Sequence, residues 1–250
     1  MKSWDIVVEV LNNLRERATV GANCVKLDKL SERIIKDNGG LPYNKGYKPS
    51  WAKTPFPASV CFSVNSEIAH GLPTLLDGSP KILKDGDIVN FDVGVVKDGI
   101  CGDAAITVGV GDIGPRNERL LYYAKKTLEA GVQKIKNGVT VGEISRELEV
   151  YASRRGFVLN KNLVGHGIGK EMHMPPKIFN FYDLDNPGND IILKTGDMVC
   201  IEPQLTYKDK VGFLSENGWT ILTRDGKNSA FFEYQVMVTP DGFNILTNWK

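Results

Sequence analysis

Apolar residues recur at helical spacing in two stretches near the N-terminus and in two more near the middle of the chain. Leu27, Leu30 and Ile34 show this spacing, and their pattern ends at Asn38-Gly39-Gly40, which is typical of a helix C-terminus. The sequence therefore predicts helices over residues 5–17, 25–37, 116–136 and 140–155, with the last ending at Gly156.

Runs rich in β-branched and aromatic residues lie between and after these helices. They predict strands over residues 59–68, 87–96, 100–110, 158–165, 197–207, 218–223 and 231–239. Residues 41–58 are rich in proline, lysine and aromatic residues, so we expect an extended loop there.

One eleven-residue segment occurs twice. Ile82–Asp92 recurs as Ile192–Glu202, with six of the eleven positions identical and an offset of 110 residues. A common turn leading into a strand would explain part of this similarity. The alternative is a chain of two similar halves, each delivering one carboxylate, Asp92 or Glu202, from the same strand position to a shared centre. Two copies at this spacing do not make a solenoid.

Asp92 and Asp103 flank a turn signal, Lys97-Asp98-Gly99, that joins two predicted strands. In a hairpin centred there we expect the two aspartates to lie nearly opposite each other, with Cβ atoms about 4.5–5.5 Å apart. Buried carboxylates this close need a proton, a basic partner or a metal ion, and neither strand contains Lys or Arg. A metal ion is the simplest answer, whereas a solvent-facing pair of aspartates is the alternative.

The chain has three histidines, and each lies in a stretch punctuated by glycine or proline: His70, His166 and His173. Histidine titrates near neutral pH and is a common metal ligand, so a histidine-dependent site is one interpretation. Three unconnected histidines in turns or in the core are the other.

Glu202 and Glu233 are lone acids within apolar strands. With Asp92, Asp103 and His166 they form an oxygen-rich set containing one imidazole, which suits Mn²⁺, Fe²⁺ or Co²⁺ and also admits Zn²⁺. Five such ligands exceed what one metal needs, and they match a pair of metals about 3.5–4 Å apart that holds a bridging hydroxide.

The composition narrows the class of protein. In 250 residues, 42% are hydrophobic and 24% are charged, which is ordinary for a globular chain. The net charge of +1 gives no bulk attraction to nucleic acid, and no apolar run is long enough to span a membrane. The four cysteines form no C-x-x-C pair, which argues against structural zinc and fits a reducing cytoplasm.

The order of motifs resembles the type I methionine aminopeptidases, metallopeptidases of family M24 with the pita-bread fold. The matching motifs are H-G-x-P at His70, D-x₁₀-D from Asp92, G-H-G-I-G around His166, I-E-P at Glu202 and F-E at Glu233. The resemblance covers nearly the whole chain. It implies an α+β fold in which a pseudo-two-fold antiparallel sheet carries helices on its outer face, and we expect one catalytic domain over residues 1–250.

The resemblance also implies which residues act. Asp103 and Glu233 would bridge two divalent metals (Mn, Fe, Co or Zn), Asp92 would bind one of them, and His166 and Glu202 the other. His70 and His173 match the catalytic histidines outside the metal ligands, and Glu202 would also act catalytically. The expected reaction removes the initiator methionine from nascent proteins, by attack of a metal-bridging hydroxide on the first peptide bond.

Substrate and ion contacts are carried over from the same resemblance. His70, His173, Cys61, Met172 and Trp219 would bind the substrate, with Tyr47 or a neighbouring aromatic residue contributing to the methionine pocket. Asn65 and Ser229 match positions near a site for one Na⁺ or K⁺. The expected partner is a nascent peptide with N-terminal methionine and a small second residue. We expect the protein to be a cytoplasmic monomer that acts near the ribosome. It should bind neither a specific nucleic acid nor a membrane.

The chain departs from the family pattern in two places. Residues 41–57 are unusual, and four extra residues lie within residues 72–82. Two other functions remain open: an exopeptidase like aminopeptidase P or prolidase, and an inactive pita-bread module used for binding. The first usually carries an additional N-terminal domain, and the second loses metal ligands, whereas all five are present here.

Overall fold

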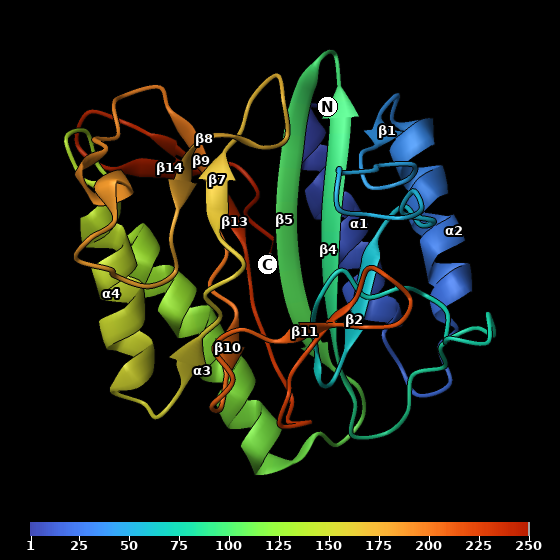
Figure 1. Ribbon diagram of the computed structural model, residues 1–250. Helices are drawn as coiled ribbons and strands as arrows, with labels where there is room; N and C mark the ends of the chain where they lie inside the picture. The colour runs from blue at the N-terminus through green and yellow to red at the C-terminus, as the bar shows by residue number, and fades with distance from the viewer. Residues whose placement is uncertain (250) are drawn as a thin grey trace.

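A computed structural model describes residues 1–249. Two helix-and-sheet halves lie side by side, with the long strands β4 and β5 between them (Figure 1). The helices are α1 (Ser3–Arg17), α2 (Cys24–Asp37), α3 (Gly114–Val132) and α4 (Val141–Ser153), and η1 (Pro187–Asp190) is a 3₁₀ turn. All four predicted helices are confirmed.

Side-chain caps explain where two of these helices start. The Asn23 side chain accepts a hydrogen bond from the backbone N–H of Lys26 and begins α2. Thr140 and Glu143 form a reciprocal capping box at the start of α4.

The strands are more broken than the sequence predicted. The first half contains β1 (Leu41–Pro42), β2 (Cys61–Val64), β3 (Glu67–Ala69), β4 (Ile88–Lys97) and β5 (Ile100–Gly109). The second half contains β6 (Val158–Leu159), β7 (Gly165–Gly167), β8 (Met174–Ile178), β9 (Met198–Ile201), β10 (Leu205–Thr206), β11 (Phe213–Leu214), β12 (Ile221–Leu222), β13 (Tyr234–Val238) and β14 (Phe243–Ile245).

The predicted strands over 59–68 and 197–207 each divide into two. Asn65 has a positive φ of 57°, which turns the chain between β2 and β3. Pro203 cannot donate a ladder hydrogen bond, and it lies between β9 and β10. The sequence patterns missed β1, within the predicted loop, and β8, β11 and β14.

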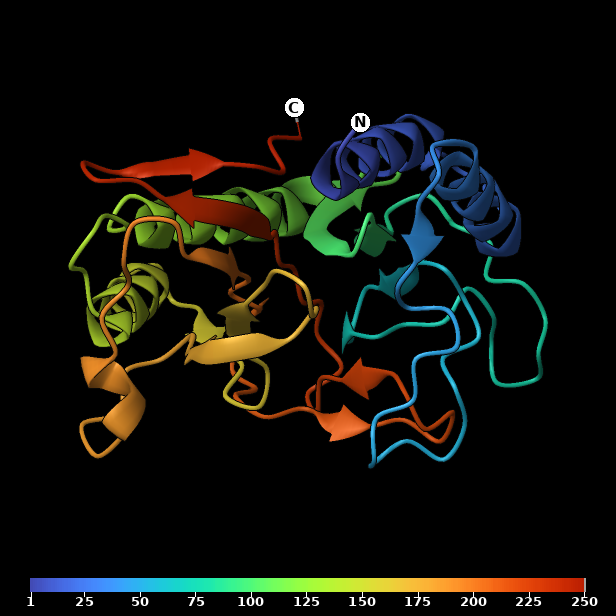
Figure 2. The same cartoon turned by 90° about the horizontal axis from the view of Figure 1, so that it is seen from above.

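Two antiparallel sheets meet beneath the cavity. In the first, β4 pairs with β5 along one edge and with β1 and β2 along the other. The second has the order β14-β13-β9-β7-β8. The backbone N–H of Glu233 donates to the carbonyl of Ala105 (2.9 Å), which joins the segment before β13 to β5. Helices α1 and α3 lie along the same side of the two sheets (Figure 2).

The sequence repeat corresponds to a repeat in structure. The N–H of Lys84 donates to the Asp87 carboxylate (2.8 Å), and the N–H of Lys194 donates to the Asp197 carboxylate (2.7 Å). Both copies turn at a glycine with positive φ, Gly86 in the first copy and Gly196 in the second, and both continue into a strand, β4 or β9. The prediction of two similar halves is therefore confirmed.

One hydrophobic cluster contains residues from both halves, from Ile6 in α1 to Trp249 near the C-terminus. We propose on this basis that residues 1–250 form a single catalytic domain, although residue 250 lies outside the described part. Within residues 1–249, no helix is both long and apolar enough to cross a membrane.

Candidate active site

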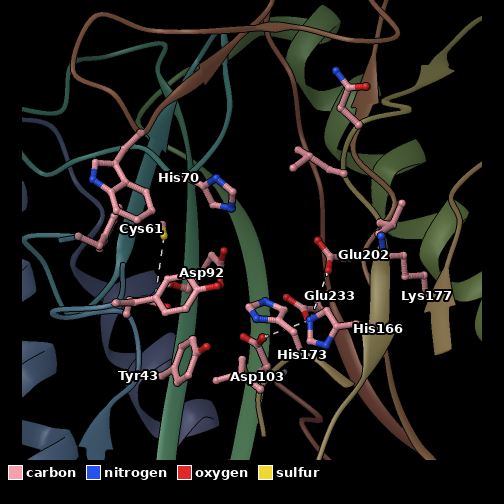
Figure 3. A pocket seen from close by; sticks show the side chains of 18 of the residues that line it. Tyr43, Cys61, His70, Asp92, Asp103, His166, His173, Lys177, Glu202 and Glu233 are labelled. Atoms are coloured by element: carbon pink, nitrogen blue, oxygen red, sulfur yellow. Dashed lines mark hydrogen bonds and ion pairs between the residues drawn. The ribbon is translucent and has the colours of Figure 1, made fainter. Parts of the chain in front are cut away.

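A cavity of about 500 Å³ opens between the two halves. Cys61, Asp92 and His70 face it from the first half, and His166 and Glu202 from the second (Figure 3). The lining includes all three histidines and the four acids singled out in the sequence: His70, His166, His173, Asp92, Asp103, Glu202 and Glu233. The interpretation of three unconnected histidines is therefore wrong.

The two aspartates of the β4–β5 hairpin are not directly opposite each other. Asp98 and Gly99 both have positive φ (51° and 73°), so the turn has two residues and Lys97 pairs with Ile100. Asp92 consequently faces Ala105, and Asp103 faces Gly94. The two aspartates are therefore two residues out of register and not at the predicted spacing of a directly opposite pair, but they remain diagonal neighbours on one face.

The second half adds Glu202, Glu233 and His166. Glu202 directly follows β9 and Glu233 directly precedes β13, and the pairing of Tyr234 with Ile201 brings the two glutamates together. The Nε2 atom of His166 lies 3.7 Å from Asp103 Oδ2 and 3.7 Å from Glu202 Oε1. Donors from five strands or their flanks thus line the same cavity.

The tautomer of His166 indicates what belongs between these donors. Its Nδ1 lies 3.0 Å from the carbonyl oxygen of Gly167, so a proton on Nδ1 leaves the Nε2 lone pair facing the carboxylates. A lone pair and several carboxylates can share this space only if protons or cations lie among them.

Burial disfavours charge throughout the cluster. Burial, reinforced by the neighbouring carboxylates, raises the pKa of Asp103, Glu202 and Glu233 well above their usual values. Burial also raises the pKa of Asp92 to about 7 and lowers the pKa of His166 to about 4. Glu233 Oε1 is buried without a hydrogen-bond partner. These donors fit divalent metal ions, which would stabilise the carboxylates in their charged form.

Cys200 is a neighbour that the sequence analysis missed. One ligand atom from each of Asp103, His166, Cys200 and Glu233 lies within 4.8 Å of the others. Cys200 stands two residues before Glu202, and side chains two apart on a strand share a face, so strand periodicity could have revealed it. Burial and the nearby Glu233 carboxylate raise the pKa of its thiol well above the usual value.

Two histidines line the cavity beside this cluster. His70 directly follows β3 with a φ of 55°, and its Nδ1 is buried without a hydrogen-bond partner. His173 packs edge-on against His166, with ring centroids 4.6 Å apart, and lies 6.0 Å from the ring of Tyr43. Burial lowers the pKa of both imidazoles, that of His70 to about 4. Both rings are therefore neutral near pH 7.

Apolar side chains form the remaining wall. Cys61, Met172 and Trp219 are buried and line the cavity, as the sequence predicted. The expected loop over residues 41–58 supplies further lining aromatics: Tyr47, which the sequence analysis named, and its neighbours Tyr43, Trp51 and Phe56. Phe56 packs edge-on against Trp219, with ring centroids 5.0 Å apart.

Comparison with known proteins gives a consistent result. A profile for metallopeptidase family M24 matches residues 2–240. The methionine aminopeptidase of Clostridium perfringens is 37% identical over 246 residues, spanning 98% of this chain and 93% of the relative. The chain belongs to metallopeptidase family M24.

Solved structures separate the branches of this family. A methionine aminopeptidase from Thermotoga maritima superposes with a TM-score of 0.89 at 34% identity, covering 98% of this chain and 93% of the other. An Xaa-Pro dipeptidase from Bacillus anthracis gives a TM-score of 0.75 at 19% identity and covers 59% of that chain, which shows the shared fold alone. The chain thus groups with the methionine aminopeptidases, the pita-bread fold is confirmed, and the prolidase-like alternative is not favoured.

Asn65 and Ser229 lie beside each other away from the cavity lining. The N–H of Ser229 donates to the carbonyl oxygen of Asn65 (2.9 Å). The Asn65 side chain already bonds the Asp87 carboxylate and the N–H of Ile88. The two residues are therefore adjacent, and a monovalent cation there stays a prediction.

Proposed function

We propose that this M24 member removes N-terminal methionine from nascent proteins and that five residues hold two divalent metal ions for the reaction. The main support for this proposal is one cavity that has an apolar wall and is also lined by five potential metal ligands: Asp92, Asp103, His166, Glu202 and Glu233. In this assignment Asp103 and Glu233 would be shared by both ions, Asp92 would hold one, and His166 and Glu202 would hold the other.

When bound, the metals would lower the pKa of water and polarise the scissile carbonyl group. The protein holds these ligands in place from behind. The Gln235 side chain accepts a hydrogen bond from the N–H of Asp103 (3.2 Å), and Gln204 Nε2 donates to Glu202 Oε2 (2.7 Å). The first contact fixes the backbone that carries Asp103, and the second fixes the direction of the Glu202 carboxylate.

Glu202 is the group best suited to move a proton. Its carboxylate, kept charged by the bound metals, would accept a proton from the attacking water and pass it to the leaving amine. The His173 imidazole N–H would stabilise the developing charge on the carbonyl oxygen. His70, with its unpartnered Nδ1, would hydrogen-bond the scissile amide nitrogen and hold it in line.

The apolar wall matches the methionine side chain. Cys61, Trp219 and Met172 provide a slot for an unbranched thioether, and a flexible methionine in the wall adapts its shape. One methylene is worth only about 1–3 kcal/mol in such a pocket, so N-terminal leucine should be cleaved poorly rather than not at all. A free amine is required at the metal ligated by Asp92, and a small second residue is preferred.

A peptide assay tests this function. Met-Ala-Ser should be cleaved, whereas Ala-Ala-Ser, acetyl-Met-Ala-Ser and Xaa-Pro peptides should not. Prolonged chelation should abolish activity, and Mn²⁺, Co²⁺ or Fe²⁺ should restore it. Cleavage of Xaa-Pro in preference to Met-Ala would point to a prolidase-like enzyme. If elemental analysis shows that the protein is free of metal and it is still fully active, the metal-dependent mechanism is wrong.

Further expectations accompany this function. We infer a cytoplasmic monomer that meets its substrates near the ribosome, and the four unpaired buried cysteines support a reducing compartment. We also propose that one Na⁺ or K⁺ binds near Asn65 and Ser229. The two divalent ions would come from Mn, Fe, Co and Zn, according to their cellular availability.

A further inference from the structure

The loop over residues 48–55 is fastened at both ends. The N–H of Gly46 donates to the carbonyl of Phe56 (2.9 Å), and the N–H of Phe56 donates to the carbonyl of Tyr47 (2.8 Å). These bonds close the neck of the loop, so residues 48–55 project from it as a unit. The neck residues Tyr47 and Phe56 themselves line the cavity.

The projecting loop is also held along its length. The indole N–H of Trp219 donates to the carbonyl of Thr54 (3.1 Å), and the N–H of Ala52 closes a turn onto the carbonyl of Pro49 (3.0 Å). Ala52 is buried in a small cluster with Phe56 and Trp219. The loop is therefore seated on the pocket wall, and Trp51 occupies a defined position within it.

Trp51 differs from the other aromatic residues of that wall. Its side chain is 53% exposed, whereas Trp219 is 3% exposed and Phe56 is 3% exposed. The Trp51 ring packs edge-on against Trp219, with centroids 5.1 Å apart, and lies 6.5 Å from His70 with its plane 25° from the imidazole plane. A large apolar ring thus remains open to solvent beside the catalytic cavity and can bury more surface against a ligand.

The position of His70 indicates which part of a bound peptide would lie near the Trp51 ring. Under the proposed function, the methionine side chain fills the buried slot at Cys61 and Trp219, and His70 contacts the scissile amide nitrogen. Cys61 and His70 face the same side of the cavity (Figure 3). The peptide that continues from the scissile nitrogen would then begin beside His70, and the half-exposed Trp51 ring lies 6.5 Å from that imidazole.

We propose that Trp51 is a specificity-determining residue whose indole packs against the third residue of the peptide and favours an apolar or aromatic side chain there. This inference rests on the proposed function. The family motifs do not explain the unusual loop at residues 41–57, and this role for Trp51 would give that loop a function. The second residue remains close to the metal ligands and stays small, whereas the third is the first with free space toward the loop.

The test compares two peptides that differ only at the third position, Met-Ala-Phe-Ser and Met-Ala-Ser-Ser. An aromatic pair at a partly exposed site corresponds to about a three- to tenfold ratio of kcat/KM in favour of phenylalanine. Trp51→Ala should bring this ratio close to one, by lowering kcat/KM for Met-Ala-Phe-Ser more than for Met-Ala-Ser-Ser. Trp51→Phe should keep most of the ratio, and Lys53→Ala, in the same loop, should keep all of it.

Other outcomes would overturn the assignment. If the kcat/KM ratio of the two peptides is near one in the wild type, or is unchanged in Trp51→Ala, Trp51 does not contact the third residue. An equal loss of kcat/KM for both peptides would show that Trp51 only supports the loop, and altered discrimination between Met and Leu at the first position would place it in the methionine pocket. Failure of the wild type to cleave either peptide would instead refute the proposed function itself.

Discussion

The two halves of the molecule share a backbone plan but contribute different chemistry. In each half the repeated segment turns at a glycine and delivers an acid from one strand, Asp92 on β4 or Glu202 after β9. The strand that pairs beside it differs. Ser63 lies across from Asn90 in the first half, whereas His166 lies across from the equivalent Cys200 in the second.

Because of this difference, the two proposed metal positions have different donor atoms. Ser63 is used inside the protein, because its hydroxyl accepts a hydrogen bond from the N–H of Gly71 (3.0 Å). His166 instead directs Nε2 toward Asp103 and Glu202. Among the five proposed ligands, the first half therefore offers oxygen donors only and the second adds a nitrogen, which favours different ions and roles at the two positions.

Removing a bridging acid should have the largest effect, because it damages both halves at once. We expect Asp103→Ala and Glu233→Ala each to lower kcat/KM by about 10³-fold or more, since metal catalysis supplies several kcal/mol. Elemental analysis should show reduced metal content in both. Asp98→Asn, in the same hairpin but outside the cavity, should retain activity and metal. Loss of rate with full metal content would contradict the bridging assignment.

The histidines should separate into one ligand and two catalysts. We expect His70→Ala and His173→Ala to lower kcat by about 10²–10³-fold while binding two metal ions, since each removes one positioned donor. His166→Ala should lose affinity at one metal position and retain the oxygen-only position of the first half. Calorimetric metal titration of the three variants measures this. If His166→Ala binds metal as tightly as the wild type and His173→Ala binds it more weakly, His173 is the ligand and His166 the catalytic residue.

The metal-free protein should become less stable as pH rises above about 6.5, where Asp92, with its pKa raised to about 7, also loses its proton. The pKa values of Asp103, Glu202 and Glu233 are raised in the folded state, so their protonated forms stabilise it and this contribution is lost as pH rises through the folded pKa values. His70 and His166, with pKa values lowered to about 4, act only below about pH 6.5 and do not affect this window.

Thermal unfolding of chelated protein at several pH values checks this sign. Adding Mn²⁺ should reverse the trend, because metal binding requires deprotonated carboxylates and strengthens as pH rises. A melting temperature of the chelated protein that rises between pH 7 and pH 9 would show that these acids are already charged without metal.

The smallest expected effect tests the shared backbone plan. Gly86→Ala and Gly196→Ala place a side chain at φ of 87° and 95°, which should cost about 1–2 kcal/mol of unfolding free energy in each half. Specific activity of the folded protein should be unchanged. Denaturant unfolding measures both, and costs that differ by more than about 1 kcal/mol would show that the two turns are not equivalent.

The sequence by itself determined the local elements and the identity of the reactive residues. Helical periodicity gave α1 to α4 because each buries one apolar face, and the repeat gave two halves because the same turn precedes the same strand position. The motif order around His70, Asp92, His166 and Glu202 predicted a methionine aminopeptidase, and comparison with relatives confirmed that family.

Only the tertiary structure decided how these residues meet. The two positive φ values at Asp98 and Gly99 set the hairpin register, a choice between turn types that differ by little in local energy. Strand periodicity places Cys200 on the same face as Glu202, but only the pairing of β7 and β13 on either side of β9 brings it to His166 and Glu233. Trp51 likewise reached the cavity through the hydrogen bond of Trp219 to Thr54, a contact spanning most of the chain that depends on packing and cannot be recognised from residue spacing.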